Sequence, residues 1–303
     1  ECAGLLRVRR FVPLSPDRLA RPQQFKFRER FQVRSNRRLR WAVIPVGVLT
    51  ALVLAGCTQQ ELQGYLPGSP TVTNHTGGII SMWVTSWIVL MVVGVITWAL
   101  ILWAAIAYRR RRGQSGLPVQ MRYNMPIEIL YTVVPLILVI GFFAFTAREQ
   151  ASIEEPFADE PQVLIEAYGK QWSWDFNYVN EDVYFAGVQA QEDADGQIDG
   201  DNVPTLVLPV GATVEVELES RDVIHSFWVV DFLYKKDMFP GKTNHMYFIP
   251  QEEGTYLGKC AELCGEYHSL MLFKVEVVSQ AEYDSYIESL RAAGNEGQLG
   301  SEY

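Results

Sequence analysis

The sequence predicts a transmembrane helical hairpin followed by an all-β domain of the Greek-key sandwich or barrel type. Two uncharged apolar runs, residues 79–108 and 129–146, approach or exceed the roughly 20 residues needed to cross the hydrocarbon core of a membrane. An arginine cluster at 109–112 separates the two runs. Beyond residue 151, short β-rich stretches alternate with Gly and Pro turn signals, a pattern typical of sandwiches and barrels.

The N-terminal region has the order of a secretory signal peptide. A basic stretch, 26–40, precedes an uncharged stretch, 41–56, that ends in small residues. The string Leu-Ala-Gly-Cys at 54–57 resembles a bacterial lipobox, in which the cysteine becomes the lipidated first residue of the mature protein. We therefore expect residues 1–56 to be a signal peptide that is removed before a lipidated Cys57. An additional uncleaved helix is the alternative.

Charges beside the apolar runs predict the topology of the hairpin, residues 79–148. A basic cluster next to a membrane span marks the cytoplasmic side, so residues 109–112 predict a cytoplasmic loop between helices at about 79–108 and 127–147. Both ends of the hairpin then lie outside, and residues 57–78 form an extracytoplasmic segment. The expected location is a bacterial plasma membrane, which the chain crosses more than once with its C-terminal domain outside the cytoplasm.

The predicted β-domain occupies residues 149–279, and a terminal helix and tail occupy 280–303. Ser279 and Glu282 form the pattern of a capping box, which predicts a helix that ends near residue 293. Residues 189–202 are acidic and contain Gly, so we interpret them as a solvated loop. The expected strands are 163–168, 172–179, 205–208, 213–219, 225–230, 244–249, 255–259 and 270–278.

Charge and cysteine usage narrow the class of protein. The whole chain has a net charge of −9, but from residue 149 onward there are 8 basic and 30 acidic side chains, a net of −22. Such a domain repels nucleic acid and attracts basic partners. The chain has four cysteines, which is too few for a disulfide framework. Metal binding or lipidation is the better use of them, and they are Cys2, Cys57, Cys260 and Cys264.

The strongest chemical pattern is Cys260-Ala-Glu-Leu-Cys264-Gly-Glu-Tyr-His268-Ser-Leu-Met271, with His225 upstream on a predicted strand. Soft thiolate and thioether ligands beside imidazoles favour copper. A structural zinc site would leave Met271 without a role, and the spacing of the two cysteines is not the usual one. A disulfide would leave both histidines idle, and a mononuclear blue-copper site needs only one cysteine. Two thiolates that can both bridge suggest two metal ions.

On these residues the chain resembles subunit II of the haem–copper cytochrome c oxidases, over about residues 75–280. The motif Cys-x-Glu-x-Cys-x₃-His-x₂-Met is the most specific part of the resemblance. The resemblance implies a cupredoxin-like domain that holds a binuclear copper centre, CuA. In that centre two cysteines bridge the coppers, two histidines are terminal ligands and a methionine is a weak ligand. The corresponding residues here are Cys260 and Cys264, His225 and His268, and Met271.

Three further residues gain expected roles from the resemblance. Glu262 would coordinate copper through its backbone carbonyl, and its carboxylate would bind a Mg²⁺ or Mn²⁺ ion shared with subunit I. The segment Tyr-Gly-Lys-Gln-Trp-Ser-Trp at 168–174 is similar to the family's aromatic stretch, so Trp172 would accept electrons from cytochrome c; the family commonly has His at the position of Lys170. Glu128, at the start of the second helix, would stand near the entrance of a proton pathway into subunit I, although a Glu in a first helical turn is also favoured by the helix dipole.

The implied function is that of a subunit of a proton-pumping aa3-type oxidase, which passes electrons from cytochrome c to haem in subunit I for the reduction of oxygen to water. Expected partners are subunits I and III, membrane lipids, and either soluble cytochrome c or a membrane-bound cytochrome c of a bc1-oxidase supercomplex. The sequence lacks Cys-x-x-Cys-His, so no haem is predicted in this chain.

Three rival functions fit less well. Nitrous oxide reductase needs many more histidines than the four present here, and quinol oxidase subunits II lack the copper ligands. A copper carrier or assembly factor would have no use for Trp172 or Glu128.

Overall fold

The computed structural model describes residues 58–111, 113–117, 120–192 and 195–300, all within the compact unit Cys57–Tyr303. The expected signal peptide, Cys2 and Cys57 lie outside the described residues, so cleavage and lipidation stay predictions. A short helix, α2 (Gln59–Leu62), begins with a capping box between Thr58 and Glu61.

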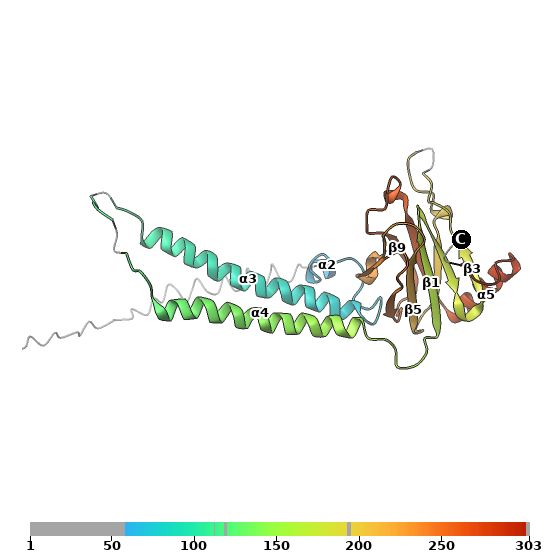
Figure 1. Cartoon of the computed structure of the whole chain (residues 1–303), viewed down its shortest axis with the longest axis horizontal. Helices are drawn as coiled ribbons and strands as arrows, with labels where there is room; N and C mark the ends of the chain where they lie inside the picture. The colour runs from blue at the N-terminus through green and yellow to red at the C-terminus, as the bar shows by residue number, and fades with distance from the viewer. Residues whose placement is uncertain (1–57, 112, 118–119, 193–194, 301–303) are drawn as a thin grey trace, which may run out of the picture. The chain divides into compact units, whose positions relative to one another are not determined.

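Two long helices form the hairpin (Figure 1). Helix α3 (Thr76–Ala107) has 32 residues and therefore extends over about 48 Å, more than the roughly 30 Å thickness of a bilayer core. Helix α4 (Met125–Ile153) begins at Asn124, whose side chain accepts a hydrogen bond from the backbone N–H of Ile127. Both helices are long and apolar enough to span a membrane.

Helix α4 continues past the expected end at residue 147 to Ile153. The predicted end was placed where the apolar run stops, before Arg148. Charged side chains do not end a helix when they point into water, so the helix continues. The extra turns carry Glu154, at the C-cap, to a salt bridge with Lys236.

The remainder is a sandwich of two five-stranded sheets. The first has the order β3-β2-β1-β5-β8, and the second has the order β4-β10-β9-β6-β7. The first sheet contains β1 (Val163–Lys170), β2 (Ser173–Tyr178), β3 (Val183–Ala186), β5 (Val214–Ser220) and β8 (Asn244–Phe248). The second contains β4 (Thr205–Pro209), β6 (His225–Val229), β7 (Tyr234–Met238), β9 (Gly254–Cys260) and β10 (Leu272–Val278). The predicted all-β sandwich is confirmed, and strands β1, β5 and β9 are marked in Figure 1.

Two strands, β3 and β7, were not predicted from the sequence. β3 has only four residues, and β7 reads Tyr-Lys-Lys-Asp-Met, with a charged middle that hides its two buried ends. Both are outermost strands, where polar outward positions are tolerated. Helix α5 (Gln280–Ala292) begins with the expected capping box of Ser279 and Glu282.

An aromatic cluster fills the space between the sheets beneath β6. The ring of Trp174, on β2, lies 5.6 Å from Phe227 and 4.9 Å from Phe273, which come from the opposite sheet. Phe227 and Phe273 stack at 4.5 Å, and all three rings are buried. Large interlocked rings of this kind hold neighbouring backbone firmly. This cluster supports the strand that begins at His225, whose ring lies 6.4 Å from Trp174.

Candidate metal centre

Two neighbouring strands bring the predicted ligands to one end of the second sheet. His225 is the first residue of β6, and Cys260 is the last residue of β9; the two strands are antiparallel, with Phe227 opposite Cys260. The backbone N–H of Ala261 donates to Ser226 O at 3.0 Å, and that of Cys260 donates to Met271 O at 3.0 Å. Backbone hydrogen bonds therefore fix the positions from which the side chains project.

The loop between β9 and β10 supplies the other predicted ligands. Cys264 follows Cys260 by four residues, and a 3-10 turn over His268–Leu270 returns the chain to Met271. Cys260, Cys264 and Met271 are buried, with exposed fractions of 4%, 3% and 0%. The end of β9 and the loop after it thus place three sulfur-bearing side chains inward, beside His225.

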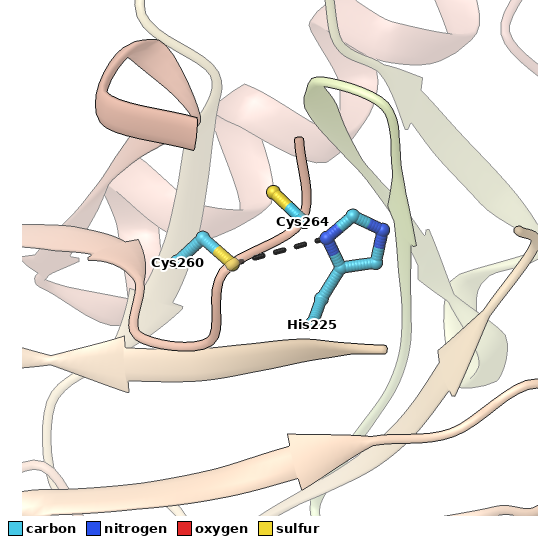
Figure 2. A group of neighbouring side chains, drawn as sticks. All are labelled: His225, Cys260 and Cys264. Carbon is cyan, nitrogen blue, oxygen red and sulfur yellow. Dashed lines mark hydrogen bonds between the residues drawn. The ribbon is translucent and has the colours of Figure 1, made fainter. Parts of the chain in front are cut away.

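The donor atoms form two similar pairs. Cys260 Sγ lies 3.8 Å from His225 Nδ1, and Cys264 Sγ lies 3.4 Å from His268 Nδ1. Met271 Sδ lies 3.6 Å from Cys264 Sγ, and the donors of His225, Cys260 and Cys264 all fall within 4.8 Å of one another. Figure 2 shows these last three side chains beside one another, with the contact between Cys260 and His225 dashed. Two sulfurs, each with its own imidazole, fit copper ions bridged by both cysteines, because thiolate and imidazole are ligands that copper prefers.

Burial sets the protonation state of the metal-free donors. Burial and the neighbouring Cys260 sulfur raise the pKa of the Cys264 thiol to about 12. Burial also lowers the pKa of His225, although its hydrogen bond to Asp222 opposes that shift. At neutral pH the imidazole is therefore neutral and ready to bind, whereas copper must displace a proton from the thiol.

Asp222 supports the centre from outside the ligand set. Its carboxylate accepts a hydrogen bond from His225 Nε2 at 2.7 Å, so the imidazole presents Nδ1 to the sulfur. The same carboxylate accepts from the backbone N–H groups of Gln171, at 2.7 Å, and Val223, at 2.6 Å. Partial burial raises the pKa of Asp222. The three hydrogen bonds lower this pKa by more than burial raises it, so the net shift is downward. An ionised carboxylate that orients a ligating imidazole is a common device in metal sites.

Asp222→Asn should weaken copper binding by about 10–100-fold, because the imidazole loses its anionic partner. A competition titration of the full chain against a copper chelator measures this. Asp284→Asn, an exposed carboxylate on α5, is the matched control and should leave the affinity unchanged. Equal affinities for Asp222→Asn and the unmodified chain would contradict the assigned role.

Trp172 lies against the ligand loop. Its indole Nε1 donates to the backbone oxygen of Cys264 at 3.3 Å, and Gln171 Nε2 donates to the same oxygen at 2.7 Å. The ring of Trp172 also meets Tyr267 edge-on, with 4.9 Å between centroids. Trp172 is partly exposed, so it joins the surface to the backbone of a predicted copper ligand through one hydrogen bond.

An ion-pair network fixes the turn that carries Trp172. Lys170, at the end of β1, pairs with the buried Asp175 of β2 at 2.8 Å, and Asp175 also contacts Arg221. Arg221 lies over the Tyr168 ring, 4.5 Å from its centroid. Lysine at position 170 thus takes part in holding the β1–β2 turn.

The two remaining predicted site residues differ in place: Glu262 lies on the ligand loop, and Glu128 lies on α4. Glu262 is exposed, and its backbone oxygen lies 3.1 Å from Cys260 Sγ. Glu128 is in the first turn of α4, where its carboxylate accepts from the backbone N–H of Asn124 at 2.8 Å. Sequence reasoning missed Asp222 and Tyr267. An acidic residue three positions before a predicted ligand His was the available clue to Asp222.

Comparison with known proteins gives one consistent family. Residues 163–278 match the model of the family described as cytochrome c oxidase subunit II, periplasmic domain. A probable cytochrome c oxidase subunit 2 of Streptomyces avermitilis is 44% identical over 286 residues, which cover 83% of this chain and 88% of that protein. A cytochrome c oxidase subunit 2 of Mycobacterium tuberculosis is 31% identical over 286 residues, with 78% of each chain covered.

Among solved structures, the chain is similar to the periplasmic domain of subunit II of the cytochrome oxidase of Bradyrhizobium japonicum. The two are 30% identical, the match covers 45% of this chain and 99% of that domain, and the TM-score is 0.40.

Proposed function

The chain belongs to the cytochrome c oxidase subunit II family, and on that premise we propose that it receives electrons from cytochrome c at a binuclear CuA centre and passes them to haem in subunit I. It is a membrane protein and part of a haem–copper oxidase complex. The observation that carries the proposal is the pairing of each buried cysteine sulfur with one imidazole, Cys260 with His225 and Cys264 with His268.

Each residue of the cluster has a proposed task. Cys260 and Cys264 would hold the copper ions through their thiolates, His225 and His268 would bind through their imidazoles, and Met271 would add a weak thioether. When bound, the copper pair supplies a one-electron carrier whose charge is shared by two ions. The sulfur donors and His225 are buried beside the aromatic cluster of Trp174, Phe227 and Phe273, which keeps water from them and limits rearrangement around the centre. The backbone oxygen of Glu262 faces the same sulfur as His225, which supports its proposed role as a further ligand.

Trp172 is the proposed point at which electrons enter. The indole is partly exposed and hydrogen-bonded to Cys264 O, so an electron that reaches the ring is one hydrogen bond from the backbone of a bridging cysteine. The strongly acidic second half of the chain favours a basic cytochrome c as the donor, because opposite charges steer association. A membrane-bound cytochrome c of a bc1-oxidase supercomplex is the second proposed donor.

Rapid mixing of reduced cytochrome c with the assembled oxidase tests this function. Copper absorbance should change first, and haem reduction in subunit I should follow. Haem reduction without a preceding copper phase would contradict the proposal.

The remaining assignments concern the assembled oxidase. We propose that the Glu262 carboxylate, which is exposed, binds Mg²⁺ or Mn²⁺ at the contact with subunit I. Carboxylate oxygen is a ligand that both ions favour. Subunits I and III and membrane lipids are the proposed neighbours, and a bacterial plasma membrane with Cys57 lipidated at its outer face is the proposed location. The oxidase is proposed to be of the proton-pumping aa3 type.

Glu128→Gln should slow proton uptake by the assembled oxidase and leave the copper spectrum unchanged, if Glu128 stands at the entrance of a proton pathway. The amide still accepts the hydrogen bond from Asn124 N–H, so the helix start is preserved. Proton uptake measured with a pH-sensitive dye, beside the optical spectrum, checks both expectations. Unchanged uptake and turnover would reduce Glu128 to a capping residue.

A further inference from the structure

A second group of metal-binding side chains lies on the outer face of the first sheet. Strand β5 alternates buried aliphatic residues with partly exposed acids, so Glu215 and Glu217 project on the same face. His245 comes from the adjacent strand β8, where it stands opposite Glu217 in the antiparallel register. The strand pairing therefore fixes three potential ligands beside one another.

The distances among these side chains suit a single small ion. His245 Nδ1 lies 3.0 Å from Glu215 Oε1 and 3.8 Å from Glu217 Oε1, and the three donors all fall within 4.8 Å of one another. Donors at zinc bond lengths in a tetrahedral arrangement are separated by about 3.4 Å. Because the observed separations bracket that value, small side-chain rotations bring all three donors to one ion.

The face holds more negative charge than one imidazole can offset. The carboxylates of Glu215, Glu217 and Glu219 project from one face of β5, where like charges repel one another. Glu166 stands opposite Glu217 on β1, so the acids occupy two adjacent strands. A divalent cation would relieve this repulsion, whereas the imidazole of His245 contacts two of the four carboxylates, Glu215 and Glu217.

We propose that Glu215, Glu217 and His245 bind one divalent transition-metal ion of the Zn²⁺ class. One imidazole nitrogen and two carboxylate oxygens form a ligand set that zinc accepts, and soft sulfur ligands of the kind that favour copper are missing from this group. Three protein ligands leave a position for water or for a group from a partner. The ion would connect β5 to β8, the outermost strand of its sheet.

Equilibrium dialysis of the full chain against Zn²⁺ tests the proposal, with the cysteine-containing centre first filled with copper. Copper in that centre keeps zinc from the cysteines, and its absorbance reports that the centre stays intact. One zinc per chain is expected at this site. Glu217→Gln and His245→Gln should each lower the zinc affinity by at least about tenfold, because a direct ligand is worth at least as much as a supporting residue.

Glu219→Gln is the matched control. Glu219 lies on the same strand and face, but its carboxylate accepts a hydrogen bond from the Thr243 hydroxyl, at 2.6 Å, instead of facing the His245 ring. Its zinc affinity should fall by less than about threefold, because Glu219 adds charge to the face but no ligand atom. An equal fall in all three variants, or no fall in Glu217→Gln and His245→Gln, would overturn the site and leave only diffuse surface charge.

Hydrogen exchange gives a second readout that does not depend on counting ions. Bound zinc should slow amide exchange in β8 (Asn244–Phe248), because the ion ties this outermost strand to β5. The slowing should disappear in Glu217→Gln. Equal amide exchange rates in β8 of the unmodified chain with and without zinc would also contradict the proposal.

Discussion

Cys264→Ser should abolish the two-copper centre and leave the β-sandwich folded. The sulfur of Cys264 contacts both His268 Nδ1 and Met271 Sδ, so its loss removes the bridge on one whole side of the proposed centre. Loss of a residue that supports a ligand lowers metal affinity by about 10–100-fold. Loss of Cys264, a direct ligand, should lower the copper affinity by more than this. Serine is close in size, and the backbone oxygen of Cys264 keeps its hydrogen bonds from Gln171 and Trp172.

Copper content and the absorption spectrum of the full chain measure this effect, and circular dichroism checks the fold. Met271→Leu is the graded control: it removes only the weak ligand, so two coppers should remain with an altered spectrum. Retention of an unchanged spectrum in Cys264→Ser would refute the bridging role of this cysteine.

Trp172→Phe should slow electron transfer from cytochrome c to the copper centre by at least about tenfold, which corresponds to about 1.4 kcal/mol in activation free energy. Phenylalanine keeps an aromatic ring beside Tyr267 but has no N–H group for the Cys264 oxygen. Stopped-flow mixing with reduced cytochrome c measures the rate. The static copper spectrum should not change, because Trp172 is outside the ligand set.

Trp228→Phe is the control for loss of any partly exposed indole. Trp228 lies on β6 with the Lys259 ammonium 4.8 Å from its ring centroid, and it has no predicted part in electron transfer. Its rate should equal that of the unmodified chain. Equal rates in Trp172→Phe and Trp228→Phe would remove the special role of Trp172.

The structure brings the five predicted copper ligands together, and four of the five stand out in the sequence because they lie within twelve residues. Cys260 ends β9, and Cys264, His268 and Met271 follow it on the next loop. Their soft sulfur and imidazole chemistry is visible without a fold. His225 is distant in sequence, and its pairing with β9 brings it beside Cys260. The two apolar helices were equally plain, since their length and lack of charge suffice to mark a membrane span.

Features that depend on register were not predictable. Asp222 supports His225 only because the turn before β6 folds its carboxylate back onto the imidazole and onto Gln171 N–H. The group of Glu215, Glu217 and His245 exists only because β5 and β8 pair in one particular register. A slip of one residue would turn these side chains to the opposite face of the sheet.

Electron paramagnetic resonance of the copper-loaded full chain tests the central claim most directly. Two equivalent copper nuclei that share one unpaired electron give a hyperfine pattern of seven lines, which the pairing of Cys260 with His225 and Cys264 with His268 predicts. A four-line pattern, from an electron on a single copper, would contradict the binuclear centre.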